Sequence, residues 1–165
     1  MDPAAAHPNA ALIERFYAAL GRRDAEAMIA CYASDVTFSD PVFTRLDAAG
    51  AAAMWRMLCA RGRDLAVTAS DIGADEKSGH AHWDATYTYS ATGRRVVNRI
   101  DAQFEFRDGL ICRHRDSFDL YRWLRQALGL KGAALGWLPV VQHKVQAQAA
   151  RTLAHWQAAT GGSER

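Results

Sequence analysis

The sequence predicts an α+β fold in which helices pack on the concave face of a curved antiparallel sheet. Three patterns along the chain predict it. Apolar residues recur at helical spacing up to residue 61, alternate with polar residues from 65 to 118, and return to helical spacing after residue 119. A block of helices followed by a block of antiparallel strands is typical of the α+β class.

The first third of the chain is predicted to be mainly helical. A helix is expected over 8–21, and Asp24 is a good N-cap for a short second helix. An alanine-rich helix follows over 47–61. Between the second and third helices a brief strand begins at Val36 and runs into Pro41. Because Pro41 cannot donate to a strand ladder, that strand ends or lies at a sheet edge there.

The period-two pattern that follows predicts four strands. They cover residues 65–72, 79–89, 94–106 and 110–118. Thr92-Gly93 and Asp108-Gly109 are strong hairpin turns between them. If Thr92-Gly93 is a two-residue turn, the apolar faces match and Tyr87 pairs with Asn98.

The second hairpin needs a longer turn for its apolar faces to match. A two-residue turn would place Arg113 opposite Phe104, on the apolar face. A three-residue turn over 107–109, with a left-handed glycine, avoids this and forms a type I turn with a glycine bulge. Asn98 then becomes the diagonal neighbour of Asp116, about 7 Å away.

The last of these strands carries the most informative residues of the chain. Side chains alternate between the faces of a strand, so His114 and Asp116 share its apolar face. The opposite face carries Arg113 and Arg115, which belong in water. Burying two ionisable groups without partners costs on the order of several kcal/mol each. The pair therefore indicates either an active site or a satisfied structural network.

Two further helices are expected after the sheet. One ends at Gly129 and the other begins at Pro139. The glycine-rich bend between them, 128–138, is unusually apolar. We expect it to cover the mouth of the curved sheet or to pack against a second subunit. Contact with a membrane surface is a third interpretation.

Composition argues against several classes of protein. The formal net charge is only +2, without the concentrated basic stripe that nucleic-acid binding requires. No apolar segment reaches the roughly 18 residues of a membrane span, and the N-terminus lacks the features of a signal peptide. Cys31, Cys59 and Cys112 are an odd, widely spaced set. They argue against a disulfide framework or a zinc knuckle and fit a reducing, cytoplasmic environment.

One further group has the residue types of metal ligands. His80, His82 and Asp84 lie on one strand face, but the register turns that face outward, opposite Asp101 and Glu105. A polar outer face or a dimer interface is a simpler interpretation than a metal site. We therefore expect no bound metal.

Three motifs are informative together. They are Glu14-Arg15-Phe16-Tyr17-Ala18-Ala19-Leu20 followed by Asp24, then Asp35-Val36-Thr37-Phe38-Ser39-Asp40-Pro41-Val42, and finally Asp108-Gly109-Leu110-Ile111 followed by His114-Arg115-Asp116-Ser117-Phe118-Asp119. They resemble segments of the nuclear transport factor 2-like superfamily, which includes ketosteroid isomerases, SnoaL-like polyketide cyclases and limonene epoxide hydrolases. The resemblance covers about residues 10–120. It implies one domain over 1–165 whose sheet forms a cone around a pocket, with 119–157 as a helical extension, and a homodimer.

The resemblance also implies roles for individual residues. The segment ending at Asp40 is similar to the isomerase segment that ends in the catalytic base, so Asp40 would shuttle a proton. Asp116 corresponds to the epoxide hydrolase aspartate that activates water, and Asn98 to an asparagine that helps to hold it. The isomerase tyrosine that holds the oxyanion falls at Phe16, with Tyr17 one position away. Neither activity therefore transfers whole.

We predict a cofactor-free acid–base enzyme, of the isomerase, polyketide cyclase or epoxide hydrolase type, acting on an apolar small molecule. The alternative is a non-catalytic ligand-binding or assembly module on the same fold. The predicted catalytic residues are Asp40, His114 and Asp116. The predicted substrate-binding residues are Phe16, Tyr17, Trp55, Trp83, Tyr87, Asn98 and Phe118. Structural interpretations stay open: Asp40 as a turn residue, His114 as a core histidine, and the aromatic residues as core.

Overall fold

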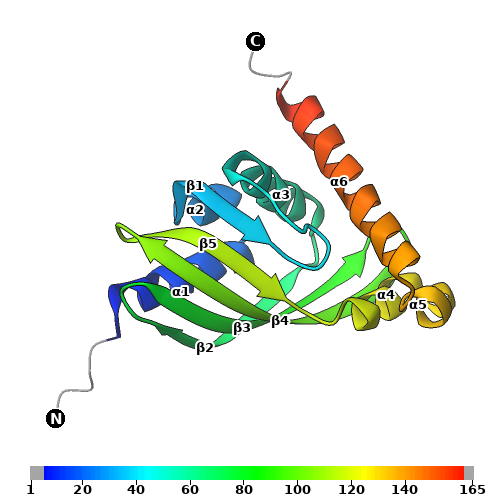
Figure 1. The fold of residues 1–165 in the computed structure, drawn as a ribbon, viewed down its shortest axis with the longest axis horizontal. Coiled ribbons are helices and arrows are strands. Elements are labelled where there is room, and N and C mark those ends of the chain that lie inside the picture. Colours follow the sequence, from blue (N-terminus) through cyan, green and yellow to red (C-terminus); the bar gives the residue numbers. More distant parts are fainter. Residues whose placement is uncertain (1–5, 162–165) are drawn as a thin grey trace.

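The computed structural model describes residues 6–161. Its helices are α1 (Pro8–Gly21), α2 (Ala25–Ile29), α3 (Ala48–Arg61), α4 (Leu120–Leu128), α5 (Leu130–Leu135) and α6 (Pro139–Gly161). Its strands are β1 (Tyr32–Ser39), β2 (Ala66–Ala74), β3 (Ser78–Tyr89), β4 (Arg94–Arg107) and β5 (Leu110–Ser117). Figure 1 shows one curved sheet with α1, α2 and α3 on its concave side, and α4 and α5 at one end, from which α6 extends.

The strands form one open sheet in the order β1-β5-β4-β3-β2. Neighbouring strands are antiparallel except β1 and β5, which are parallel. The main core lies between the inner face of this sheet and helices α1 to α3. The predicted α+β fold is confirmed, and each strand predicted between 65 and 118 ends within two residues of its observed limits.

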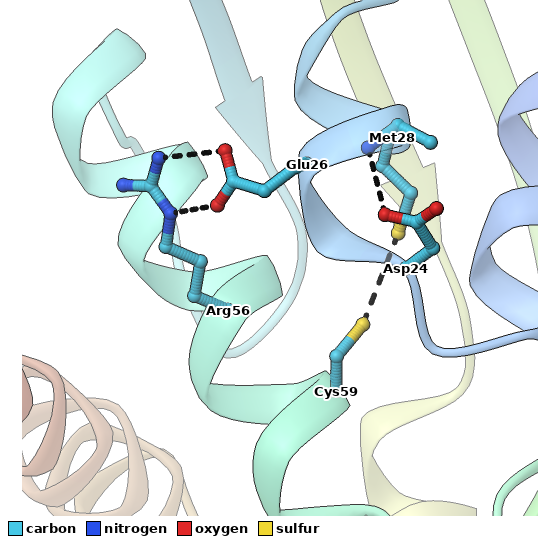
Figure 2. A network of polar contacts seen from close by, with 6 residues as sticks. Asp24, Glu26, Met28, Arg56 and Cys59 are labelled. Atoms are coloured by element: carbon cyan, nitrogen blue, oxygen red, sulfur yellow. Dashed lines mark hydrogen bonds and ion pairs between the residues drawn. The ribbon is translucent and has the colours of Figure 1, made fainter.

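Helix α2 is short and is held in place by its cap and by α3. Asp24 caps it by accepting a backbone N–H bond at 3.1 Å, as predicted. Figure 2 shows the contact with α3, where the Glu26 carboxylate accepts two bonds from the Arg56 guanidinium at 2.6 and 3.1 Å. The thiol of Cys59 reaches the Met28 sulfur at 4.0 Å. Because an exposed ion pair contributes little stability, the burial of Met28 in the main core holds α2 more firmly than the ion pair does.

The predicted register of the first hairpin is wrong by two residues. Pairing begins across the loop 90–93, so Tyr87 lies opposite Val96 rather than Asn98. Thr92 in this loop donates its hydroxyl hydrogen to a backbone carbonyl of α4 at 2.5 Å, a tertiary contact that the strand pattern does not reveal. The shift is an even number of residues, so every side chain keeps its predicted face.

The predicted turn of the second hairpin is also wrong. Asp108-Gly109 is a two-residue turn with positive φ at both positions, 54° and 76°. A bulge then shifts the register between β4 and β5, which places Phe104 opposite His114 and Ala102 opposite Asp116. The bulge achieves what the longer turn was predicted to achieve, because it keeps the neighbouring arginines on the outer face.

The predicted glycine-rich bend at 128–138 contains a helix, α5. Gly129 ends α4 with φ at 65°. Gly132 lies so close to α4 that an added Cβ would come within 2.0 Å of the Leu124 carbonyl oxygen. The missing side chain therefore lets α5 pack directly on α4, which is a tertiary reason for glycine at this position.

Helix α6 runs from α5 past the segment that follows β1 and packs on α3. Its Gln146 side chain donates to the Pro41 carbonyl at 3.0 Å, Leu153 is buried in the main core, and the Arg61 guanidinium of α3 lies over the Trp156 ring at 5.6 Å. Within residues 6–161, no helix combines the length and apolar character needed to cross a membrane.

Candidate functional site

Two aspartates lie at one end of the sheet. Strands β1 and β5 run parallel, with Phe38 opposite His114. Asp116 lies two residues further along β5, and Asp40 directly follows the end of β1 at Ser39. Both aspartates therefore lie at the same end of the sheet, where the charge of Asp116 acts on Asp40. The sequence suggested each aspartate separately, and the parallel pairing that joins them was not predicted.

Asp116 ends a chain of buried hydrogen bonds. Its Oδ1 lies 2.8 Å from Nε2 of His114, and Nδ1 of His114 lies 2.8 Å from the Tyr32 hydroxyl. The indole N–H of Trp55 donates to that hydroxyl at 2.9 Å. A neutral imidazole satisfies every group, because the hydroxyl accepts from Trp55 and donates to Nδ1, which leaves Nε2–H for the carboxylate.

His114 itself is sealed in the core. Five aromatic rings surround its imidazole with centroids 4.5 to 6.2 Å away: Phe16, Tyr32, Phe38, Trp55 and Phe104. The His114 side chain is 0% exposed and that of Asp116 3%. Among the described residues, the second oxygen of Asp116 has no hydrogen-bond partner. This arrangement suits a histidine that positions Asp116 and does not itself contact a ligand.

Asp40 is half-buried just after β1. Its Oδ1 accepts backbone N–H bonds from Val42 and Phe43 at 2.7 and 2.6 Å, so it is also the turn residue expected before a proline. Burial nevertheless raises the pKa of Asp40 to about 7, against the lowering effect of these bonds and with help from the charge of Asp116. The other carboxylate oxygen accepts no hydrogen bond from residues 6–161. Asp40 can therefore exchange a proton near neutral pH.

Two neighbouring buried donors on the concave side of the sheet lack an acceptor. The hydroxyl of Tyr17 and the indole N–H of Trp83 have no hydrogen-bond partner among the described residues, and their ring centroids are 5.6 Å apart. Burial, then the charge of Asp116, raises the pKa of Tyr17 well above its usual value, so the hydroxyl keeps its proton. Because buried donors in native proteins are almost always paired, these two groups are places for an oxygen of a ligand or of water.

Small residues lie beside Asp116 on the inner face. In the ladder Asp116 lies opposite Ala102, which in turn lies opposite Ala81. The Tyr17 ring contacts Phe104 on one side of this row and Trp83 on the other. The alanine row, the free oxygen of Asp116 and the two unpaired donors thus belong to one region of the concave side.

A Tyr17→Phe variant is expected to be at least as stable as the wild type without ligand, because the lost hydroxyl has no protein partner. Urea unfolding should show a change within about 1 kcal/mol. Tyr32→Phe is the matched control, since it removes the same atom from a hydroxyl with two partners and should cost about 1–3 kcal/mol. Equal losses in the two variants would contradict the unpaired state of Tyr17.

The other predicted binding residues fall into two groups. Phe16 and Trp55 are buried and form walls of the cage around His114. Tyr87 and Phe118 are half-buried. Burial raises the pKa of Tyr87 to about 12, and its hydroxyl accepts a hydrogen bond from the Trp123 indole of α4 at 2.6 Å.

Asn98 does not lie beside Asp116, contrary to the predicted register. Asp116 faces Ala102, and Asn98 is four residues further along β4, which is about 13 Å at the usual rise per residue. No side chain or backbone group in residues 6–161 bonds to the Asn98 amide. Water held jointly by Asn98 and Asp116 is therefore not supported by this geometry.

Sequence reasoning did not identify Tyr32 as a member of the site. Tyr32 begins β1, ahead of the motif over 35–42, so its position beside His114 depends on the parallel pairing of β1 with β5. The residue type alone could have indicated this role, because the hydroxyl of a buried tyrosine needs a hydrogen-bond partner.

The polar cluster on the outer face forms an ion-pair network. Nδ1 of His82 lies 2.8 Å from Asp101 and Nε2 lies 3.0 Å from Asp84, and the bond to Asp101 is the largest cause of a raised His82 pKa. Nearby, a hollow of about 390 Å³ is lined by polar residues such as His80 and Glu105, on the face away from Asp40 and Asp116. In the part of the chain described, no three His, Cys, Asp or Glu side chains are placed to hold a metal ion.

Comparisons with known proteins agree with this architecture. A family model described as a SnoaL-like domain matches residues 13–114, more than half of the chain. No sequence among the curated proteins matches significantly. A candidate polyketide cyclase from Xanthomonas campestris pv. campestris is 26% identical with a TM-score of 0.59, covering 73% of this chain and 96% of that one.

Two more distant structures support the fold alone. An LEH-like epoxide hydrolase from M. tuberculosis is 23% identical with a TM-score of 0.59, covering 80% of this chain and 96% of that one. A protein of ketosteroid isomerase-like fold from Catenulispora acidiphila, solved with trimethylamine, is 15% identical with a TM-score of 0.64. The match covers 78% of this chain and 97% of that one. Given the family match and the open cone of sheet, this chain belongs to the SnoaL-like domain family of the nuclear transport factor 2-like superfamily.

Proposed function

We propose that this protein catalyses proton transfer at a carbon next to a carbonyl group of an apolar small molecule, without a cofactor. The observation that carries the proposal is that Asp40 and Asp116 lie at one end of the sheet, close enough for the charge of Asp116 to act on Asp40, while the unpaired donors of Tyr17 and Trp83 lie on the same concave side. A carboxylate with a pKa near 7 can take and return a proton at neutral pH. Two fixed donors can stabilise the negative charge that develops on the carbonyl oxygen.

In this mechanism the free oxygen of Asp40 removes a proton from the substrate carbon. The electron pair of the C–H bond moves onto the carbonyl oxygen, which accepts hydrogen bonds from Tyr17 and Trp83. Where the substrate has a C=C bond next to that carbon, the product of this step is a dienolate. Asp40 then gives the proton to the far carbon of the former C=C bond, the carbonyl re-forms and the double bond shifts, which completes an isomerisation. Alternatively the enolate carbon attacks a second carbonyl and the new alkoxide takes the proton, which completes an aldol-type cyclisation.

The remaining residues act through Asp40. Asp116, positioned by His114, helps to keep the pKa of Asp40 high through its negative charge. The neighbour described as a candidate polyketide cyclase supports carbonyl chemistry of this kind. Epoxide hydration has less support here, because Asn98 lies too far from Asp116 to share a water with it.

The test is hydrogen exchange at carbon. A panel of apolar ketones and 1,3-diketones is incubated with the protein in D2O, and deuterium incorporation is followed by NMR. We expect at least one member to exchange about a hundredfold or more faster than in buffer. If none does, while panel members still shift the Tyr17 ring resonances, the protein is a ligand-binding module rather than an enzyme.

A further inference from the structure

The corner formed by α5 and the start of α6 exposes an unusual group of large apolar side chains. Among the described residues, six large apolar residues are exposed, and four of them lie within 130–140. These four, here named the apolar corner, are Leu130 (89%), Leu135 (48%), Trp137 (63%) and Val140 (58%). Leu58 and Val97, the other two, stand alone on different elements. A soluble chain rarely leaves such a group uncovered without a function.

The helices that form and flank the apolar corner carry charges of one sign only. Residues 120–161 contain five Arg and Lys and no Asp or Glu, although the whole chain has 20 basic and 18 acidic residues. The five are Arg122, Arg125, Lys131, Lys144 and Arg151. Arg94 of β4 adds a sixth cation, since its guanidinium donates to the Gln126 carbonyl and lies against Gly129. The surface that covers the corner should therefore be negatively charged.

The position of the corner suits a flat partner. Figure 1 shows α5 at the end of the molecule, beyond the sheet. The indole N–H of Trp137 already donates to the Ala134 carbonyl at 3.1 Å, so the ring can enter an apolar layer without leaving that donor unpaired. Exposed tryptophan and leucine flanked by lysine and arginine are typical of proteins that bind at a lipid interface. A second copy of this chain would instead bring like charges together.

We propose that the apolar corner docks reversibly on an anionic lipid surface. Leu130 and Trp137 enter the boundary of the acyl chains, and Arg125, Lys131 and Lys144 contact lipid phosphates. This inference is independent of the proposed function, because it uses no residue of the aspartate site.

The experiment measures binding of the full chain to two kinds of vesicle by co-sedimentation. One is phosphatidylcholine alone, and the other contains about one third phosphatidylglycerol. We expect binding to the anionic vesicles that weakens with salt. The double variant Leu130→Ser with Trp137→Ser should bind the anionic vesicles at least about tenfold more weakly than the wild type. Lys131→Glu should bind them about fivefold more weakly.

Leu58→Ser is the matched control, because it removes an exposed leucine far from the corner and should bind like the wild type. Circular dichroism shows whether each variant is folded. The proposal fails if the wild type does not bind anionic vesicles at about 0.1 M ionic strength, or if the double variant binds as well as Leu58→Ser. It also fails if light scattering shows a dimer that the double variant dissociates while vesicles bind neither protein. That result would assign the corner to an interface between copies.

Discussion

An Asp40→Asn variant is expected to lose about 10²- to 10⁴-fold of the carbon–hydrogen exchange activity and to keep its fold. An asparagine oxygen can still accept the backbone N–H bonds of Val42 and Phe43, so the turn is retained. The amide cannot take a proton from carbon. Exchange rates in D2O, measured by NMR for the most reactive ketone of the panel, give the ratio.

Asp47→Asn provides the comparison for this variant. Asp47 caps α3 by accepting the Gly50 N–H bond at 2.8 Å, and asparagine caps equally well, so activity should not change. An Asp40→Asn protein that keeps wild-type rates would remove Asp40 from the mechanism.

Asp40→Asn should also change how the free energy of unfolding depends on pH. The pKa of Asp40 is about 7 in the folded protein, against the ordinary value of 3.8 for an aspartate exposed in the unfolded chain. The folded state therefore binds this proton more tightly than the unfolded state. The contribution of Asp40 to stability is therefore complete below about pH 4 and is lost as the pH rises to about 7. The loss is at most about 4 kcal/mol, reduced by the partial exposure of the carboxyl. Urea unfolding at several pH values should show a flatter profile for Asp40→Asn.

His114→Leu is expected to destabilise the protein by about 3–5 kcal/mol. The leucine fills much of the aromatic cage, but it removes the acceptor of the Tyr32 hydroxyl hydrogen and the donor to the Asp116 carboxylate. Both groups are buried, so each keeps the cost of its lost hydration. Urea unfolding near pH 7 measures the difference.

Asp116→Asn distinguishes the loss of the network from the loss of the charge. Its side-chain oxygen can still accept from Nε2 of His114, so the variant should lose no more than about 1.5 kcal/mol. It should also lower the pKa of Asp40, because the charge of Asp116 is one cause of the raised value. If His114→Leu proves as stable as the wild type, the buried chain from Trp55 to Asp116 does not form.

Local patterns in the sequence determined which elements form and which way their side chains face. Alternation along the last strand placed His114 and Asp116 on the buried face, and both are buried. Asp24 marked the start of one helix and Pro139 the start of another. These features depend on neighbours a few residues apart, which is why they can be predicted from the chain itself.

Register depended on more than the turn residues. The loop after β3 makes a contact with α4, and the turn after β4 is shorter than predicted because a bulge restores the alternation. Both errors preserved the faces, since each kept the parity of the side chains. They did not preserve the neighbours, so Asn98 was expected beside Asp116 and lies far from it.

The sequence by itself therefore determined the α+β fold and an inner face that carries a histidine and an aspartate. Only the tertiary structure decided that Asp40 joins Asp116, that Tyr32 and Trp55 complete the buried chain, and that Tyr17 and Trp83 are left without partners. The physical reason is distance along the chain. β1 and β5 are about eighty residues apart in sequence, and their parallel pairing is selected by how the whole core packs rather than by a local pattern.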